Sequence, residues 1–363
     1  MKVSEIPARR LRNLRLTGPS FTSPVDAIRW HGAMQAQDYG PAKWSVGQRS
    51  TGVGDKDLDR ALAEGSIVRT HVLRPTWHFV ARDDLRWLLA LSGPRVHQHM
   101  RARLRQLGLD DQVLVRCRAI IVSALKGGMT LTRNEIGSIL EHAGIDRSGQ
   151  RLAHILGHCE LEVLICSGGL KGKHHSYALA DERVPNEDRF DRDEALVELT
   201  RRYLRSHGPA AVEDFRWWAS LTVADIRKAL DMLGAQVQSE IIDDVVLWSM
   251  ASDSEPPPRA HGVHLLQAYD ELVVGYTRSR FLGDPQARRA QTAWRDRTLP
   301  NGFVLWDGRL AGHWRRTNHK DSTRLEVFTY EQPKAIVPAL QAAGDNFGAF
   351  TGREVTLTVR GID

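Results

Sequence analysis

Hydrophobic and polar positions along this chain repeat one order of elements three times, in which two helices joined by a turn are followed by two strands. The middle copy shows this order most clearly. Thr132 and Glu135 form the sequence pattern of a capping box at the start of its first helix. Leu152, Ile155 and Leu156 recur at helical spacing in its second helix. The copy is predicted to contain helices over 132–142 and 150–159 and strands over 161–166 and 177–180.

The two strands of the middle copy are joined by a glycine-rich, basic segment, residues 167–175. Lys171 and Lys173 flank Gly172 within it. Glycine allows the backbone to turn tightly, and the lysines make the segment positively charged. We therefore predict an exposed hairpin loop, of the kind called a wing, that presents Lys171 and Lys173 to a polyanion.

The two other copies follow the same order with different turn residues. Gly208 and Pro209 end the helix before the third copy, and Asp243-Asp244 marks its hairpin turn. In the more divergent N-terminal copy, the turn is predicted at Arg74-Pro75. The third copy has predicted helices over 212–219 and 222–233 and strands over 236–242 and 245–248, and the first has helices over 23–34 and 55–64 and strands over 67–73 and 76–80.

Downstream of the third copy, the pattern becomes rich in strands. Glu255-Pro256-Pro257-Pro258-Arg259 predicts a stiff linker, and Asp307-Gly308 predicts a two-residue hairpin turn. Strands are predicted over 302–305, 310–314, 325–329 and 355–359, and a helix over 334–343.

A helix-turn-helix followed by a β-hairpin is the plan of a winged helix. The predicted fold class is therefore α+β, with three tandem winged-helix units and a β-rich C-terminal module. Winged helices bind DNA in some proteins and dock other proteins elsewhere, so the repeat alone leaves both roles open, although three copies with basic wings favour DNA. The predicted domains are residues 1–120, 121–190, 191–255 and 256–363.

The charge of the chain is compatible with a polyanionic partner. The sequence has 50 Lys and Arg against 44 Asp and Glu, a net charge of +6, which a merely arginine-rich composition also explains. The placement of these residues is more informative, because separate basic clusters suit the long footprint of a DNA duplex. The clusters are Arg9, Arg10, Arg12 and Arg15, then Arg95, Arg101, Arg103 and Arg105, and then Arg315, Arg316 and Lys320.

Three cysteines, no secretory leader and no apolar stretch of membrane-spanning length predict a cytoplasmic protein without a membrane partner. A metal site is an alternative, because His154 and His158 lie four residues apart, as zinc ligands on one helix face can. No acidic residue at a familiar spacing accompanies them. Further candidate ligands follow at Cys159, Cys166, His174 and His175. Because the acidic partner is missing, we nevertheless predict that the protein binds no metal and no cofactor.

Candidate chemistry lies in the segment that follows the first predicted helix. In an extended chain Gln35 and Gln37 project to the same side, because side chains alternate with period two. Asp38 then projects to the other side, where a structural role is favoured over a catalytic one. Gly40 and Pro41 indicate that the helix has ended by this point. A paired-amide site is one interpretation, and two solvent-facing polar residues at a helix end are the other.

The chain resembles the winged-helix DNA glycosylase family typified by the AlkZ and YcaQ enzymes over nearly its whole length. Met34-Gln35-Ala36-Gln37-Asp38 matches the family's Gln-apolar-Gln motif. The YcaQ-type branch has Asp where this chain has Gln37, so the AlkZ-type branch is the closer match. Four further segments support the resemblance to the family through their order and spacing, namely residues 73–80, 85–89, 265–271 and 304–315.

The resemblance implies three tandem winged helices that form a concave DNA-binding face. It also implies a monofunctional DNA glycosylase that hydrolyses the N-glycosidic bond of cationic N7-alkylguanine or N3-alkyladenine adducts in double-stranded DNA, with interstrand crosslinks as a further substrate. Such an enzyme needs no cofactor and leaves an abasic site. The expected setting is DNA repair and the self-resistance of a bacterium that makes a genotoxic natural product, and the expected state is a monomer.

Within this family Gln35 and Gln37 are the expected catalytic residues. An N7-alkylated purine is cationic and leaves readily, so the enzyme has chiefly to orient water and hold an oxocarbenium-like sugar. A glutamine carbonyl can do both without acting as a base. We expect Gln37 to place the water and Gln35 to support it. The expected DNA-binding residues are Arg9, Arg12, Arg74, His78, Arg309, Arg315, Arg316, Lys171 and Lys173.

Three alternatives stay open. His78 is either a DNA-binding residue or part of the core, because a histidine on an apolar strand is often a core residue. The turn at Asp307-Gly308, flanked by Arg309, Arg315 and Arg316, is either a probe of a DNA groove or an ordinary exposed turn. The rival to an enzyme is a non-catalytic winged-helix protein, either a regulator that reads palindromes as a dimer or a drug-sequestering resistance protein.

Overall fold

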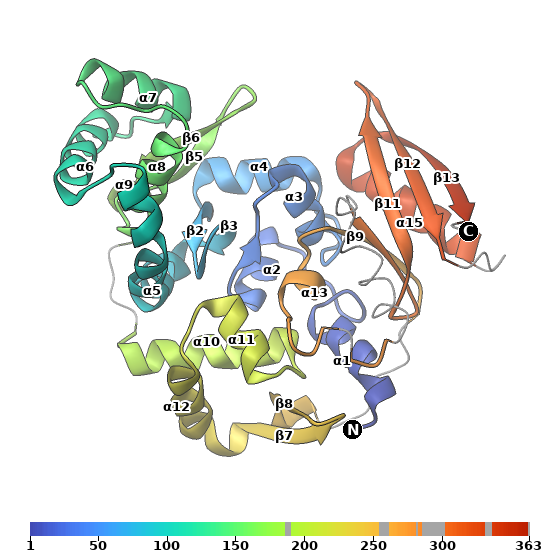
Figure 1. Ribbon diagram of the computed structural model, residues 1–363. Coiled ribbons are helices and arrows are strands. Elements are labelled where there is room, and N and C mark those ends of the chain that lie inside the picture. The colour runs from blue at the N-terminus through green and yellow to red at the C-terminus, as the bar shows by residue number, and fades with distance from the viewer. Residues whose placement is uncertain (186–189, 254–260, 281, 285–301, 331–335, 362–363) are drawn as a thin grey trace.

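The computed structural model describes residues 1–185, 190–253, 261–280, 282–284, 302–330 and 336–361. The protein has a mixed α+β fold, in which the first of three helix–strand units lies in the middle, between the other two units and a five-stranded sheet (Figure 1). The predicted linker over 255–259 lies outside the described residues. None of the described helices is both long and apolar enough to cross a lipid bilayer.

The three units, residues 24–81, 111–179 and 192–250, share one order of elements. In units 1 and 2, a helix, a two-residue strand, two helices and two strands follow one another, and the short strand pairs with the last strand, giving the orders β1-β3-β2 and β4-β6-β5. In unit 3, a single bridge between Ala210 and Trp248 takes the place of the short strand. The elements are α2 (Pro24–His31), β1 (Met34–Gln35), α3 (Tyr39–Gly47), α4 (Asp55–Glu64), β2 (Ile67–Val72), β3 (Arg74–Ala81); α6 (Asp111–Leu125), β4 (Leu131–Thr132), α7 (Arg133–His142), α8 (Arg151–Leu161), β5 (Ile165–Lys171), β6 (His174–Leu179); and α10 (Arg192–His207), α11 (Val212–Ala219), α12 (Val223–Leu233), β7 (Val237–Ile242), β8 (Val245–Met250).

Several local predictions are confirmed. The Thr132 hydroxyl accepts from the backbone N–H of Glu135, and the Glu135 carboxylate accepts from that of Thr132, which is the predicted capping box. Asp243 and Asp244 both have positive φ, 48° and 61°, as a type I′ hairpin turn requires. Asp307 and Gly308, at the other predicted two-residue turn, also have positive φ, 47° and 80°.

Three local predictions are wrong. The predicted helix over 23–34 ends at His31, and an unpredicted helix, α3, begins at Tyr39. Gly40 and Pro41 lie in the first turn of α3, where proline is tolerated because its missing N–H would be unpaired. The turn of unit 1 is Leu73, at φ 62°, so Arg74 and Pro75 already belong to β3. The wing of unit 2 is shorter than predicted, because β5 continues to Lys171.

The remaining elements join and flank the units. A helix of 22 residues, α5 (Leu85–Gln106), connects units 1 and 2, and α1 (Ile6–Asn13) precedes unit 1. The C-terminal sheet has the order β13-β12-β11-β10-β9, with α15 packed against β13 and β9. Its strand β9 was not predicted. These elements are β9 (Val263–Gln267), α13 (Glu271–Val274), β10 (Gly302–Trp306), β11 (Arg309–Asn318), β12 (Ser322–Thr329), α15 (Ile336–Thr351) and β13 (Glu354–Gly361), with α9 (Ala180–Arg183) after unit 2.

The two largest of three hydrophobic clusters among the described residues hold the units and the sheet together. The larger is continuous through all three units. The smaller joins unit 1 to the C-terminal sheet, where the Trp44 ring of α3 lies 5.0 Å from Phe347 and 5.4 Å from Phe350, centroid to centroid. The Trp44 indole N–H also donates to the carbonyl of Leu265 in β9, at 2.7 Å. Unit 1 is therefore fixed between the other units and the C-terminal sheet.

Candidate active site

The segment that carries the two glutamines is extended where β1 pairs with β3. Met34 lies opposite Phe79 and Gln35 opposite His78, and the N–H of Ala36 continues the ladder by donating to the carbonyl of Trp77 at 2.7 Å. The helix before it ends at His31 and is followed by Gly32, whose φ of 78° suits a residue without a side chain. The prediction that this segment is extended is confirmed at Gln35.

The Gln35 side chain is buried, 6% exposed, and is held by an arginine. Arg74 Nη2 donates to Gln35 Oε1 at 2.7 Å and lies 3.3 Å from Nε2 of His78. Because a guanidinium can only donate, the carbonyl of Gln35 must face Arg74 and its NH₂ group is turned elsewhere. Burial lowers the pKa of Arg74 from its usual value, although the group remains a cation at neutral pH.

Gln37 is held more weakly. Its side chain is exposed, and Gln37 Oε1 accepts from the backbone N–H of Trp77 at 3.3 Å. Its own backbone carbonyl accepts from Nη2 of Arg69, also at 3.3 Å. Asp38, beside it, is exposed at the start of α3 and makes no capping hydrogen bond with its side chain. The two glutamines thus differ in burial and in partner.

A buried carboxylate anchors the backbone of the first glutamine. Glu271, 1% exposed, accepts from the N–H of Gln35 at 2.7 Å through Oε1. Its Oε2 accepts from the indole N–H of Trp218 at 2.9 Å and lies 3.2 Å from Nε2 of His207. Despite burial, these donors hold the pKa of Glu271 at about 2. A fixed negative charge therefore lies directly behind Gln35.

A buried ion pair places this carboxylate. Arg49, which follows α3, donates through two nitrogens to Asp270 at 2.8 and 2.9 Å, and both side chains are fully buried. Asp270 also caps α13 by accepting from the N–H of Leu272 at 3.0 Å. Asp270 therefore ties the C-terminal part of the chain to Arg49, just after α3, and Glu271 ties it to Gln35, before α3.

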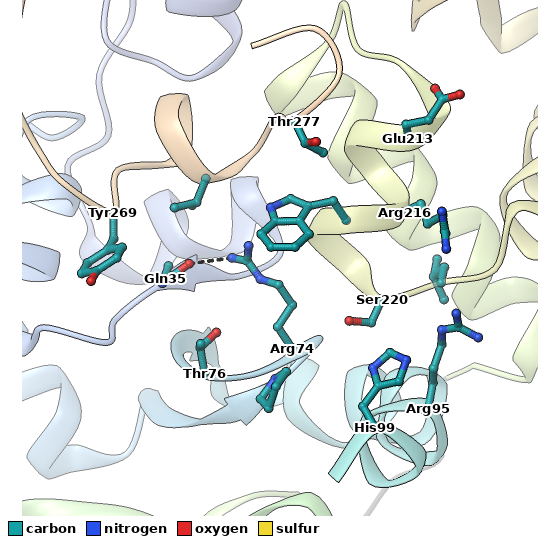
Figure 2. Close-up of a pocket in the computed structure, with 14 residues that line it drawn as sticks. Gln35, Arg74, Thr76, Arg95, His99, Glu213, Arg216, Ser220, Tyr269 and Thr277 are labelled. Atoms are coloured by element: carbon teal, nitrogen blue, oxygen red, sulfur yellow. Dashed lines mark hydrogen bonds between the residues drawn. The ribbon is translucent and has the colours of Figure 1, made fainter. Parts of the chain in front are cut away.

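Gln35 and Arg74 form part of the wall of a cavity of about 660 Å³. Figure 2 shows Arg74 reaching into its centre, with Gln35 on one side and α5 and α11 on the other. The Trp217 side chain, 53% exposed, belongs to this wall, and its ring centroid lies 5.9 Å from the Arg74 guanidinium carbon. The lining residues are Gln35, Arg74, Pro75, Thr76, Arg95, His99, Glu213, Arg216, Trp217, Ser220, Leu221, Tyr269, Val274 and Thr277.

His78 does not face this cavity as a DNA ligand. It is 0% exposed, and its Nδ1 lies 2.9 Å from the carbonyl of Thr76. Burial, with the adjacent Arg74, lowers the pKa of His78 to about 3. The prediction of a direct DNA contact is therefore corrected, because His78 offers no surface, and the core interpretation fits the structure.

The low pKa of His78 predicts a stability that depends on pH. In the unfolded chain its pKa returns to about 6.5, so between the two values the unfolded state binds the extra proton and stability falls as the pH falls. From pH 7 to pH 5 this one group should cost about 2 kcal/mol. Urea unfolding at both pH values should show a smaller loss, by that amount, for His78→Gln than for the wild type. An equal loss in both proteins would contradict the prediction.

The N-terminal arginines are bound within the protein. Arg9 is 7% exposed and donates to the carbonyl of Asp253, and Arg12 lies 3.7 Å from the Asp253 carboxylate. Arg10 is 2% exposed and donates to the carbonyls of Pro209 and Ser279. The expected DNA contact of Arg9 is corrected accordingly, since its buried side chain ties α1 to the end of unit 3.

The C-terminal basic residues do not flank one turn. Arg309 follows the Asp307-Gly308 turn, whereas Arg315 and Arg316 lie toward the far end of β11, beside the turn into β12. At about 3.3 Å per residue, Arg309 and Arg315 are about 20 Å apart along β11. The prediction that all three arginines flank the Asp307-Gly308 turn is therefore wrong. Arg309 and Arg315 are exposed, as are Lys171 and Lys173 in the unit 2 hairpin.

The cysteines considered as metal ligands are buried thiols. Burial raises the pKa of Cys159 and of Cys166 to about 12, so neither is a thiolate at neutral pH. His158 lies instead beside His97, with ring centroids 5.1 Å apart. The sequence did not reveal this partner, because His97 belongs to α5.

Sequence reasoning also missed Glu271 and Trp217 as site residues. Glu271 lies in a segment that carries the family resemblance, but its contact with Gln35 spans 236 positions. Trp217 and Trp218 are adjacent on α11, and only the structure shows that Trp218 is fully buried while Trp217 faces the cavity.

Comparison with known proteins agrees with this arrangement. The solved structure of Streptomyces sahachiroi DNA glycosylase AlkZ matches the fold with a TM-score of 0.81 at 20% identity, covering 100% of both chains. The interstrand DNA cross-link repair glycosylase of Streptomyces sahachiroi is 22% identical over 360 residues, which are 93% of this chain and 96% of the relative. The family model described as DNA glycosylase AlkZ-like matches residues 28–350. This chain therefore belongs to the AlkZ-like DNA glycosylase family.

Proposed function

We propose that this protein is a monofunctional DNA glycosylase that releases a cationic N7-alkylguanine or N3-alkyladenine from double-stranded DNA. The observation that carries the proposal is the buried amide of Gln35, fixed by Arg74 and Glu271 at the wall of a cavity of about 660 Å³. A cavity of this size accommodates a drug-sized group. A bulky adduct is therefore a suitable substrate.

The three units are proposed to act as winged helices. Their common order of elements supports this proposal, because the third helix of each unit, α4, α8 or α12, comes at the same point of the chain order as the recognition helix of that motif. The domains 1–120, 121–190, 191–255 and 256–363 are proposed on this assignment, with the first boundary moved to precede α6, which begins at Asp111. Lys171, Lys173, Arg309, Arg315 and Arg316 are proposed to contact phosphates, together with Arg12, whose side chain is one-quarter exposed.

The proposed reaction breaks the bond between the sugar C1′ and the alkylated purine nitrogen. The bond electrons neutralise the cationic base, which leaves without a proton, and a water oxygen adds to C1′ and gives its proton to solvent. Gln37 suits the placement of this water, because its side-chain carbonyl is exposed, accepts among the described groups only from Trp77 N–H at 3.3 Å, and can exchange that partner. Gln35 supports the site through its NH₂ group, since Arg74 occupies its carbonyl.

The buried charges suit an oxocarbenium-like transition state. Glu271 is a fixed anion behind Gln35, and Arg74 lies between that anion and the cavity. A normal purine would need a general acid to leave, and the only carboxylate among the described cavity-lining residues is the exposed Glu213. We therefore propose that the enzyme selects lesions that are already cationic, whether monoadducts or interstrand crosslinks, as repair or self-resistance to a genotoxic natural product requires.

The proposal is tested by the release of free modified base from duplex DNA that carries N7-methylguanine or a bulky N7-alkylguanine. We expect the wild type to release base and leave abasic sites, and Gln35→Ala/Gln37→Ala to bind the same duplex without releasing it. Size-exclusion chromatography should show a monomer. Tight binding without release from either lesion, by a dimer that prefers one palindrome, would establish the regulator instead.

A further inference from the structure

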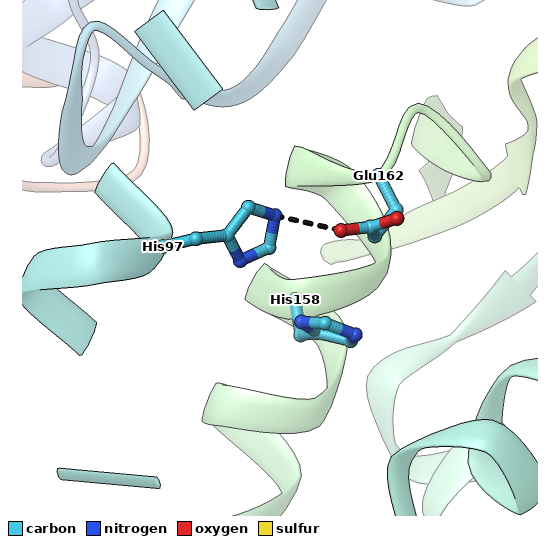
Figure 3. Close-up of side chains that lie close together, drawn as sticks. All are labelled: His97, His158 and Glu162. Atoms are coloured by element: carbon cyan, nitrogen blue, oxygen red, sulfur yellow. Dashed lines mark ion pairs between the residues drawn. The ribbon is translucent and has the colours of Figure 1, made fainter. Parts of the chain in front are cut away.

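Three potential metal ligands meet between α5 and α8, away from the two glutamines. His97 extends from α5, and His158 and Glu162 lie four residues apart at the end of α8 (Figure 3). His97 Nε2 is 2.9 Å from Glu162 Oε1, and one ligand atom from each of the three lies within 4.8 Å of the others. The donors are therefore gathered before any ion is present.

The ring nitrogens of this cluster face one another or the cluster's carboxylate. His158 Nδ1 is buried without a hydrogen-bond partner among the described groups, and His97 Nε2 pairs with Glu162, itself a member of the cluster. Burial lowers the pKa of both imidazoles, so each is neutral at pH 7 and keeps a lone pair available. The unpaired buried Nδ1 of His158 costs free energy, and a cation bound to this nitrogen would remove that cost.

The donor set indicates the class of ion. Two imidazole nitrogens and one carboxylate oxygen form a ligand set that zinc takes, with water in the fourth position. Ligands of one tetrahedral zinc ion lie about 3.3 Å apart, given bonds of about 2 Å. The ligand atoms, which lie within 4.8 Å of one another, would therefore have to approach by about 1.5 Å at most.

A cation beside the cluster opposes binding. Arg118 Nη1 of α6 lies 3.6 Å from Glu162 Oε2, and Arg101 of α5 lowers the pKa of His97 further. Arg118 neutralises part of the carboxylate charge that a metal ion would use. A site of moderate affinity is therefore expected, in which removal of Arg118 strengthens binding.

We propose that His97, His158 and Glu162 form a divalent-metal site, best suited to Zn²⁺, that fastens α5 to α8. The sequence alone predicts no metal, because His97 is 61 positions before His158 and gives no local motif. The other face of α5 carries Arg95 and His99 into the cavity, and α8 is the third helix of unit 2. A bound ion would fix that helix relative to the cavity wall.

The test is titration of metal-free protein with ZnCl₂ against a chromophoric competing chelator. We expect one ion per chain, and at least a roughly tenfold weaker affinity in each of His97→Gln, His158→Gln and Glu162→Gln. His142→Gln is the matched control, because His142 is exposed on α7 and lies outside the cluster. Zinc should also raise the melting temperature of the wild type and of this control, but not of the three variants.

A variant that keeps all three ligands tests the proposal even where a ligand substitution disturbs the fold. Arg118→Gln should bind zinc several times more tightly than the wild type, because the competing guanidinium is gone. The proposal is overturned if the wild type binds no zinc, if the three ligand variants bind as well as His142→Gln, or if Arg118→Gln leaves the affinity unchanged.

Discussion

Replacing Arg74 by glutamine is expected to lower the single-turnover rate of base release about a hundredfold, while DNA affinity changes little. Arg74 Nη2 donates to the carbonyl of Gln35 at 2.7 Å, and only this bond orients the buried amide in the described structure. Misplacement of a reacting group by about 1 Å can cost about a hundredfold in rate. Arg74 is therefore a positioning residue for Gln35.

Two comparisons separate positioning from simple loss of charge. Arg74→Lys keeps a cation but lacks the planar fork, so its single-turnover rate should stay as low as that of Arg74→Gln, although the charge is retained. Arg95→Gln removes a cation from the same cavity wall without touching Gln35, and it should weaken DNA binding and flatten its salt dependence while the bound-state rate stays near that of the wild type. Equal single-turnover rates for Arg74→Gln and the wild type would refute the role of Arg74.

Replacing Glu271 by glutamine is expected to lower the free energy of unfolding by about 3–5 kcal/mol. Three N–H donors face this side chain, from Gln35, Trp218 and His207. A carboxylate accepts from all of them, whereas the NH₂ group of a glutamine must face at least one donor. The substitution keeps the size of the side chain, so the loss reflects hydrogen bonding and charge rather than a cavity.

Urea unfolding at pH 7 measures this change. Glu213→Gln is the control, because Glu213 is exposed at the rim of the same cavity, and it should alter stability by less than about 0.5 kcal/mol. The free energy from Glu271 should also disappear in the wild type as the pH falls from about 4.5 toward about 2, since the folded-state pKa lies below the unfolded one. If Glu271→Gln unfolded like Glu213→Gln, the anchoring role of Glu271 would be wrong.

Local signals in the sequence predicted most elements of the three units. The capping box at Thr132, the paired aspartates at 243 and 244 and the helix over 212–219 were all located correctly, because each depends on residues within a few positions of one another. Helix α3 was missed because Gly40 and Pro41 also mark turns. The same pair is acceptable in a first helical turn, so its structural effect depends on whether the residues after it continue a helix.

The site was predictable only in part. The sequence indicated Gln35, and the structure adds the partners that hold it. Glu271 and Trp217 are brought to the site by contacts between units, which no periodicity reveals. Arg9 and Arg10 show the opposite error, because their charge suggested a DNA surface. Arg10 instead donates to the carbonyls of Pro209 and Ser279 and lies over the Tyr276 ring, 3.9 Å from its centroid.

The continuous hydrophobic cluster through the three units also affects the thermodynamics of recognition. Repeats that are joined by loose linkers must be aligned when they bind, and each loses rotational freedom at that moment. Here the buried side chains of all three units belong to one core, so their alignment is completed during folding. If the three units bind one duplex, as proposed above, little of the free energy of binding is needed to align them, and more of it is available to deform the DNA.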